Sequence, residues 1–324
     1  MRKPLNRLLG RIVAIGTRRD FLRAAGFVLA GGLGSTLAAA TAAPKAGLFL
    51  VGGPSLDHLG EPDTYHELIK RARNPGKPRV SFVTSASVIF RKKRMDEHLA
   101  SFQNAGVDPK NVHVISIMKA DDAPEITRDT PFAVAPEDRK ALGVALEFLR
   151  HDDVVFLDGG DQNRLVPVLK SARLDADGPS AWDLLARRYR EDDAFLLGGT
   201  SAGSAAMPRR MIHEDTVNLP EPAQYRGFNL PGLEGIAIDT HYDFRGRVWR
   251  FPAFMRKVGD RVGLGLPENG GIYLFDGVAE VFSVGTHEHT VAAQIHRGGV
   301  AVEKKYRPGE RFALADLRAE ALTG

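Results

Sequence analysis

Residues 195–207 read FLLGGTSAGSAAM. An apolar run ends in two glycines, Ser201 stands between two small residues, and more small residues follow. This layout, Gly199-x-Ser201-x-Gly203, is typical of a nucleophile elbow, in which a strand turns sharply into a helix and exposes the serine hydroxyl. An ordinary strand-to-helix turn capped by a serine uses similar residues. The apolar run before the turn and the alanines after it favour Ser201 as a candidate nucleophile.

Further apolar runs of this kind occur along the chain. Unbroken apolar runs are typical of strands that are buried on both faces of a sheet. They lie at residues 47–53, 79–84, 112–117, 153–158 and 194–198, and helix-like stretches lie at 65–73, 91–105, 136–150 and 181–190. The alternation predicts an α/β fold, a mostly parallel sheet flanked by helices. Residues 271–275, 279–284 and 300–306 are expected to add antiparallel strands near the C-terminus.

Glycine pairs are expected at the ends of three of these strands: Gly52-Gly53, Gly159-Gly160 and Gly198-Gly199. Ligands of open parallel sheets sit beyond the carboxyl ends of the strands, so we expect all three to face one crevice. Residues 214–230 are expected to form a loop or lid near it. Neither glycine-rich phosphate-binding motif is present, and we expect no nucleotide or other cofactor.

Composition excludes several classes of function. The chain has 324 residues and no cysteine, so disulfides, thiolate metal sites and cysteine nucleophiles are ruled out. Its net charge of +4 comes from the N-terminus: residues 1–43 hold seven basic residues and one acidic residue. The rest has 37 basic and 39 acidic residues, a net charge of −2. A segment of that charge is not drawn to nucleic acid or to anionic membranes, and we expect no nucleic-acid partner.

Residues 1–43 have the plan of an export signal. The basic stretch around Arg18-Arg19 is followed by Phe21-Leu22, a weakly apolar stretch and small residues at 35–43. The paired arginines resemble a twin-arginine signal, which implies export to the periplasm or beyond the cell and contact with the membrane only during export. We therefore expect a signal at 1–43 and a single catalytic domain at 44–324.

A serine nucleophile needs a base, and the base usually needs an acid to orient it. Residues 236–244 read as a strand that ends in His241, between two acidic residues, and arginines follow. Residues 262–266 form a short apolar piece that leads to Glu268. Taken singly, the histidine has the features of a structural residue, and the arginines those of a solvated helix face.

Together these segments resemble the cyanophycinase branch of the S51 serine peptidases. The resemblance runs from about Gly47 to the end of the chain. The motifs that carry it are Gly159-Gly160-Asp161-Gln162, Gly199-Thr200-Ser201-Ala202-Gly203, Asp239-x-His241-Tyr242-x-x-Arg245-x-Arg247-x-x-Arg250 and Gly263-x-Gly265-x-x-Glu268-Asn269. It implies a fold like class I glutamine amidotransferase domains, a homodimer, and cleavage of cyanophycin into β-Asp-Arg dipeptides.

The resemblance also implies a role for each motif residue. Ser201 is the nucleophile, His241 the base and Glu268 the acid, without a metal. Gly159, Gly160 and the amide of Ala202 form the oxyanion hole. The residues implied to hold the substrate are Gln162, Asp239, Thr240, Arg245, Arg247 and Arg250. Guanidinium groups bind carboxylates, and Asp239 is expected to receive a substrate guanidinium. Thr240 stands where the family usually has glutamine, which bears on the choice among acidic peptides.

Two other interpretations use the same serine. An α/β-hydrolase esterase orders its residues serine, acid, histidine, which would be Ser201, Asp260 or Asp276, and His287 or His289. A periplasmic peptide-binding protein would keep the fold with an idle serine. The pair His287-x-His289 is weak as a metal site and is more typical of a surface turn.

Overall fold

The structure is a computed structural model that describes residues 44–53, 64–74, 76–87, 92–119, 133–212, 224–243, 247–285, 288–297 and 300–323. The expected export signal at 1–43 lies outside the described residues. Residues 42–324 form one compact unit. Among the helices described, none has the length and apolar character that crossing a bilayer requires.

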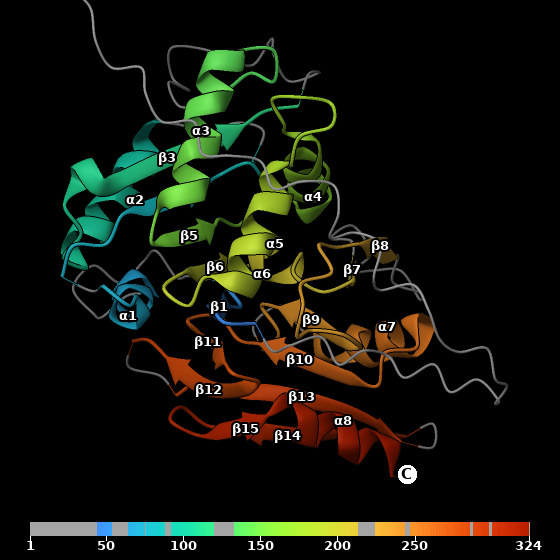
Figure 1. Ribbon diagram of the computed structural model, residues 1–324. Coiled ribbons are helices and arrows are strands. Elements are labelled where there is room, and N and C mark those ends of the chain that lie inside the picture. Colours follow the sequence, from blue (N-terminus) through green and yellow to red (C-terminus); the bar gives the residue numbers. More distant parts are fainter. Residues whose placement is uncertain are drawn as a thin grey trace, which may run out of the picture. The chain divides into compact units, whose positions relative to one another are not determined.

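A nine-stranded sheet runs through this unit (Figure 1). Its strand order is β15-β12-β11-β1-β6-β5-β2-β3-β4. The six neighbours from β1 to β4 are parallel: β1 (Gly47–Val51), β6 (Leu196–Thr200), β5 (Val154–Leu157), β2 (Val80–Val83), β3 (Val112–Ile117) and β4 (Ala133–Val134). Antiparallel strands continue it beyond β1: β11 (Gly270–Phe275), β12 (Val278–Ser283) and β15 (Arg311–Ala313). The predicted mostly parallel α/β sheet with added C-terminal antiparallel strands is confirmed.

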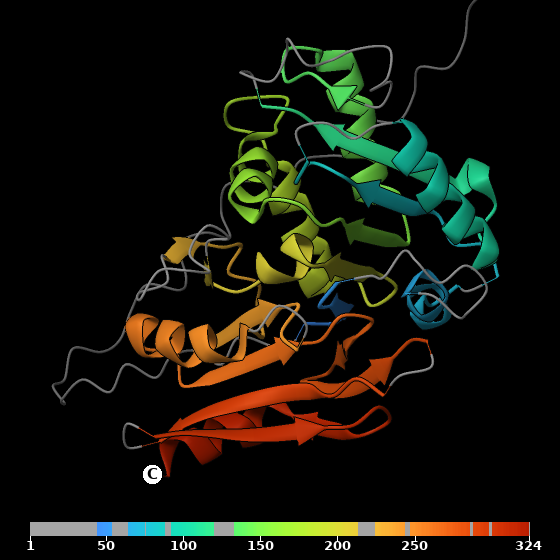
Figure 2. The ribbon, with the colours of Figure 1, turned by 180° about the vertical axis from the view of Figure 1, so that it is seen from behind.

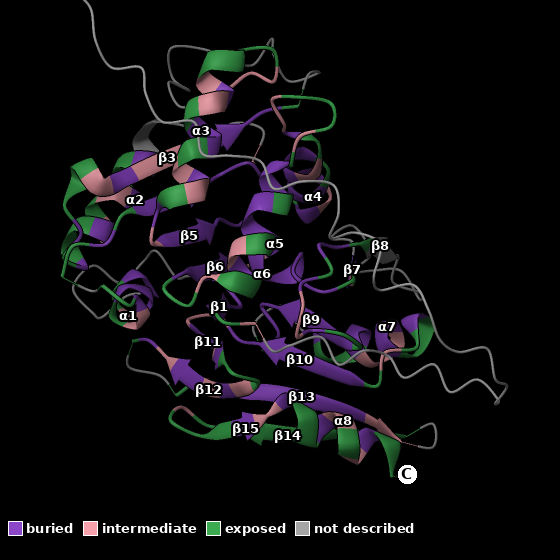
Figure 3. Cartoon of the chain, viewed as in Figure 1, coloured by how far each residue is buried: buried purple, intermediate pink, exposed green. Residues whose placement is uncertain are grey.

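Two layers of helices explain the unbroken apolar runs. Along β1, Leu48 and Leu50 belong to one core cluster, and Phe49 and Val51 belong to another on the opposite face. The first face is covered by α3 (Arg139–His151), α4 (Gln162–Ser171) and α5 (Ala181–Glu191), the second by α1 (Thr64–Arg71) and α2 (Lys92–Asn104) (Figure 2). Because both faces are covered, every residue of β1 is buried, as are the other central strands in Figure 3.

A second sheet of four strands has the order β14-β13-β10-β9. It consists of β9 (Ile236–Thr240), β10 (Val262–Leu266), β13 (Val291–Arg297) and β14 (Val300–Tyr306). Around it lie α7 (Arg250–Val258) and α8 (Leu314–Leu322). Strands β9 and β10 are parallel, with Asp239 opposite Gly265. Their carboxyl ends deliver His241 and Glu268, so this sheet supplies half of the candidate site.

The structure differs from the sequence-based expectation in several places. Gly198 and Gly199 lie inside β6 rather than in a loop after it, so the turn begins at Ser201. Part of the expected lid forms β8 (Gln224–Arg226), which pairs with β7 (Arg210–Ile212), while 213–223 lie outside the described residues. Helix α4 and strand β13 were not predicted, and the proline at position 167 inside α4 weakened its helical pattern.

Candidate active site

Ser201 sits on a sharp turn between β6 and the short helix α6 (Ala202–Ala205). Its φ of 50° and ψ of −113° are strained for a residue with a side chain, as a nucleophile elbow requires. The two motif glycines make the turn possible. A Cβ on Gly203 would lie 2.2 Å from the carbonyl oxygen of Leu157, and one on Gly199 would lie 2.6 Å from the carbonyl carbon of Gly203. Helix α6 therefore packs directly on the backbones of β5 and β6.

The end of β1 holds three segments of the site through consecutive carbonyl groups. Val51 accepts a hydrogen bond from the backbone N–H of Ser201 at 3.1 Å, and Gly52 accepts one from His241 at 3.1 Å. Gly53 accepts one from Asn269, the residue after Glu268, at 2.8 Å. One stretch of three residues thus sets the spacing of the nucleophile, the histidine and the carboxylate.

The three side chains form a continuous chain of hydrogen bonds. Ser201 Oγ lies 2.8 Å from His241 Nε2, and His241 Nδ1 lies 2.5 Å from Glu268 Oε1. The histidine is 8% exposed, which limits competition from water. A carboxylate at Nδ1 holds the imidazole so that Nε2 can accept a proton from the serine. The geometry is that of a serine–histidine–carboxylate set.

Tyr242 anchors the segment that carries the histidine. Its ring packs against Gly265 so closely that a Cβ at that position would lie 2.5 Å from the ring. The close approach explains why this position of the motif is a glycine. The Tyr242 hydroxyl donates a hydrogen bond to Glu303 at 3.1 Å and accepts one from Gln294 at 3.0 Å. Burial raises the pKa of Tyr242 well above its usual value, and the Glu303 carboxylate raises it further, so the phenol stays neutral.

The loop after β5 runs alongside the serine. A Cβ on Gly159 would lie 3.2 Å from the Cβ of Ser201, and Gly160 has a φ of +139° that disfavours any other residue. Asp161 N–H bonds the carbonyl of Ala86 at 3.0 Å and fixes the loop. The N–H of Ala202 belongs to the first residue of α6, where helix geometry offers no intrahelical acceptor. The amides of the Gly159–Gly160 loop and of Ala202 therefore lie beside Ser201, where donors to an oxyanion would have to be.

A small hollow opens in front of the serine. Its volume of about 10 Å³ is close to what one water molecule needs. Residues from both sheets line it, among them Gly160, Gln162, Ser201, Ala202, Asp239, Thr240, Arg247 and Arg250. Five of the six expected substrate-binding residues therefore lie on its wall, and Arg245 lies outside the described residues.

The charged residues of the hollow are buried and paired, so they do not form a solvated helix face. Arg250 is 2% exposed and donates two hydrogen bonds to the Asp239 carboxylate, of 3.0 and 2.6 Å. Arg247, 5% exposed, donates to the carbonyl oxygen of Thr240 at 2.9 Å. The Asp239 carboxylate is thus occupied by Arg250, which differs from the expectation that it receives a substrate guanidinium.

Part of the chain is similar in sequence to a known peptidase family. A model of peptidase family S51 matches residues 133–282, a range that contains Ser201, His241 and Glu268. The matched segment, just under half of the chain, is similar to peptidase family S51.

The proteins that resemble this chain are distant from it in sequence. A cyanophycinase from Trichormus variabilis is 31% identical over 137 residues, 41% of this chain and 43% of that protein. A cyanophycinase from Geminocystis herdmanii is 28% identical over 184 residues, 54% of this chain and 62% of that protein. The chain thus matches about half the length of these relatives. The crystal structure of a peptidase from an acI-B1 Actinobacterium covers 84% of this chain with a TM-score of 0.52 at 16% identity, a likeness of fold.

Among the described residues, those of the esterase interpretation are not assembled around Ser201. The histidine that faces Ser201 is His241, whereas His289 faces Asp243, with Nδ1 and Oδ2 3.1 Å apart. Asp276 lies between β11 and β12, and Asp260 follows α7. His287 lies outside the described residues, and within the described ones no cluster of three or more histidine, aspartate or glutamate side chains could hold a metal ion.

Two residues that contribute to the candidate site were not predicted from the sequence. Gly53 sits against the imidazole, since its Cβ would lie 2.3 Å from His241 Cε1. Asp243 accepts a hydrogen bond from the backbone N–H of Glu268 at 3.2 Å. The glycine pair and the second acidic residue beside His241 were visible in the sequence, but nothing local indicated their partners.

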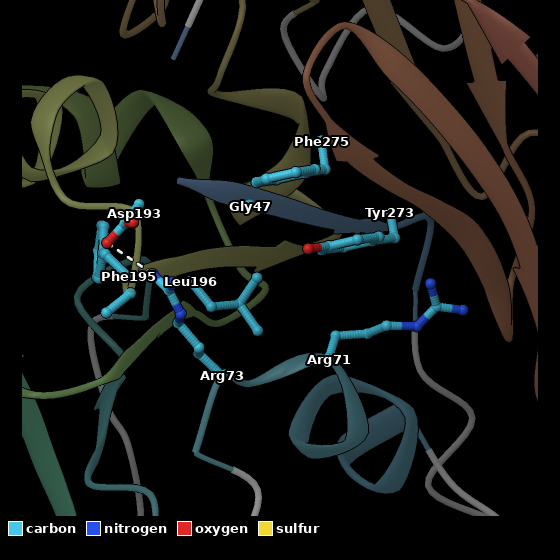
Figure 4. Close-up of a pocket in the computed structure, with 9 residues that line it drawn as sticks. Gly47, Arg71, Arg73, Asp193, Phe195, Leu196, Tyr273 and Phe275 are labelled. Carbon is cyan, nitrogen blue, oxygen red and sulfur yellow. Dashed lines mark ion pairs between the residues drawn. The ribbon is translucent and has the colours of Figure 1, made fainter. Parts of the chain in front are cut away.

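A larger hollow of about 270 Å³ lies at the opposite, amino ends of β1 and β6 (Figure 4). Arg73 pairs with Asp193 at 2.6 Å there. Arg71 pairs with Glu280 at 2.6 Å and lies 5.0 Å from the ring centre of Tyr273. Because its guanidinium groups already have carboxylate partners, this hollow presents no unpaired charge, and none of the predicted site residues lines it.

We expect Gly53→Ala to displace the imidazole from Ser201 while the fold persists, because the new methyl group meets a movable ring rather than backbone. A displacement on the order of 1 Å costs about 10²-fold in rate. The measurement is the rate at which a serine-directed phosphonylating reagent labels Ser201. Gly143→Ala, whose nearest neighbour is 3.9 Å away, is the matched control and should label at the unaltered rate. Equal rates for both variants would contradict this role of Gly53.

Proposed function

We propose that this chain is a serine-type peptidase in which Ser201 is the nucleophile, His241 the general base and Glu268 the acid that orients it. The observation that carries the proposal is the pair of contacts that link the three groups, 2.8 Å and 2.5 Å long, at a strained elbow. The family match supports hydrolysis of a peptide bond. The domain at 44–324 is proposed as one catalytic domain.

The reaction follows from the geometry. His241 Nε2 takes the proton of Ser201 Oγ as the oxygen attacks the scissile carbonyl carbon. The oxyanion that forms accepts hydrogen bonds from the amides of Ala202 and of the Gly159–Gly160 loop. The imidazolium then protonates the leaving amine, the C–N bond breaks, and an ester remains on Ser201. His241 next takes a proton from water as the water oxygen attacks the ester carbon. The C–O bond to Ser201 then breaks, the imidazolium returns its proton to Ser201 Oγ, and the acid is released.

The proposed substrate is cyanophycin, a poly-aspartate that carries arginine on its β-carboxyl groups, with release of β-Asp-Arg dipeptides. Two relatives named cyanophycinase support it. So does the hollow: Nη1 of Arg250 is buried, and among the described residues it has no hydrogen-bond partner. A buried guanidinium N–H without a partner is costly, and a substrate carboxylate would satisfy it. Other acidic or aspartyl peptides would meet the same requirement and are the alternative substrates.

The first test incubates residues 44–324 with cyanophycin and identifies the soluble products by mass. We expect wild type to release β-Asp-Arg, and Ser201→Ala and His241→Ala to fall by at least about 10³-fold because the two groups act as a unit. Glu268→Gln should cost roughly one to two orders of magnitude less. Chelators should have no effect.

The outcomes separate the alternatives. Full activity of Ser201→Ala would overturn the mechanism. A folded wild type that labels at Ser201 but leaves cyanophycin intact would reject the substrate and keep the peptidase. A folded wild type that binds acidic peptides without cleaving them would favour the peptide-binding interpretation.

A second prediction concerns Arg250. Arg250→Lys keeps a cation beside Asp239 but loses the second nitrogen that would reach the substrate. A hydrogen bond to a charged group contributes about 1.5–3 kcal/mol, so we expect KM for a short soluble cyanophycin peptide to rise about 10- to 100-fold with a smaller change in kcat. Arg256→Lys, on the exposed face of the same helix, is the control. An unchanged KM in Arg250→Lys would show that Arg250 only supports Asp239.

Export is proposed from the sequence of residues 1–43 alone. Replacing Arg18-Arg19 with two lysines should leave the protein in the cytoplasm of a bacterial host with a working twin-arginine pathway, whereas the unaltered chain should appear in the periplasmic or extracellular fraction. Cell fractionation with antibody detection measures both. Equal distribution of the two chains would contradict a twin-arginine signal.

A further inference from the structure

Asp243 links the two halves of the candidate site. It lies two residues after His241, and its Oδ1 accepts a hydrogen bond from the backbone N–H of Glu268 at 3.2 Å. The His241 segment therefore contacts Glu268 twice, through the imidazole at the carboxylate and through Asp243 at the main chain. The second contact fixes where the Glu268 side chain begins.

His289 holds Asp243 from the far side. Its Nδ1 lies 3.1 Å from Asp243 Oδ2, so the two oxygens of one carboxylate serve two partners. The Asp243 side chain is 42% exposed, and a half-exposed carboxylate with a single partner readily turns toward water. A second hydrogen bond from a side chain that is itself only 24% exposed restricts that movement.

His289 is in turn fixed to the turn that carries Glu268. Its backbone N–H donates to Ser283 Oγ at 3.3 Å, and Ser283 Oγ donates to the carbonyl of Asn269 at 3.4 Å. Asn269 also accepts from Val284 N–H at 2.7 Å and adopts a φ of +55°. The turn between β10 and β11 is thus held at Asn269 by β12 and at Glu268 by Asp243.

We propose that Asp243 and His289 are positioning residues that set the orientation of Glu268 toward His241. The proposal rests on the proposed role of Glu268 as the acid of the mechanism. Neither residue touches the reacting atoms. The pair acts on the rate only through the contact between Glu268 Oε1 and His241 Nδ1, as outer hydrogen-bond partners orient the ligands of a metal site.

A double-mutant cycle tests this route. Asp243→Ala should lower kcat on the proposed substrate about 10- to 100-fold with KM nearly unchanged, and His289→Ala about 3- to 10-fold. Asp243→Asn keeps an oxygen for the Glu268 N–H and should stay within about threefold of wild type. In a Glu268→Gln background, Asp243→Ala should cost less than about twofold, because the group through which it acts is already impaired.

A matched control is available on α3. His151 faces Glu147 at 3.2 Å in an exposed carboxylate–histidine pair, and His151→Ala should leave kcat unchanged. If the loss of kcat in the double variant equals the product of the losses in Asp243→Ala and Glu268→Gln, the two residues act independently and the proposal is overturned. A loss in Asp243→Ala that appears only as lower thermal stability, while the folded enzyme keeps its kcat, would also overturn it.

Crystal structures of wild type and Asp243→Ala make the test independent of substrate. We expect Glu268 Oε1 to withdraw from His241 Nδ1 by on the order of 1 Å in the variant, and to stay in place in Asp243→Asn. An unchanged contact in Asp243→Ala would overturn the positioning role even if the protein proved inactive on cyanophycin. Failure of the wild type on cyanophycin with the expected displacement would count against the proposed substrate alone.

Discussion

Three consecutive carbonyl groups at the end of β1, those of Val51, Gly52 and Gly53, accept hydrogen bonds from the main chains of Ser201, His241 and Asn269. The nucleophile comes from the larger sheet, and the histidine and carboxylate come from the smaller one. Because the carbonyls belong to one strand end, their spacing is fixed by backbone geometry, and three distant segments are aligned without long side chains.

This arrangement depends on close approach of main chains. A Cβ on Gly52 would lie 2.2 Å from the carbonyl oxygens of Leu266 and Pro267, and a Cβ on Gly53 would fall on the imidazole. Strand β1 lies between β6 and β11, so its end is held from both sides. A buried, doubly paired strand is stiff, and a stiff strand end suits a site in which small displacements cost rate.

Much of the fold could be predicted from the sequence because strands covered on both faces are apolar throughout, as in residues 47–51 and 154–157. The elbow was visible because Gly199 and Gly203 satisfy a local steric demand. The ion pair between Asp239 and Arg250 could not be predicted from the sequence, because its effect on stability depends on how deeply both side chains are buried. The contact between Asp243 and His289 was not predicted either, because the two residues are 46 positions apart and meet only when β9 and β13 share a sheet.

In the proposed reaction, Ser201 forms a covalent ester with an acidic peptide. The most direct measurement is to mix the protein with cyanophycin fragments, stop the reaction with acid within the first turnover, and map the modified peptide by mass spectrometry. We expect an added acyl mass on the peptide that contains Ser201, and no such mass in His241→Ala. Turnover without any adduct, or an adduct on another residue, would contradict it.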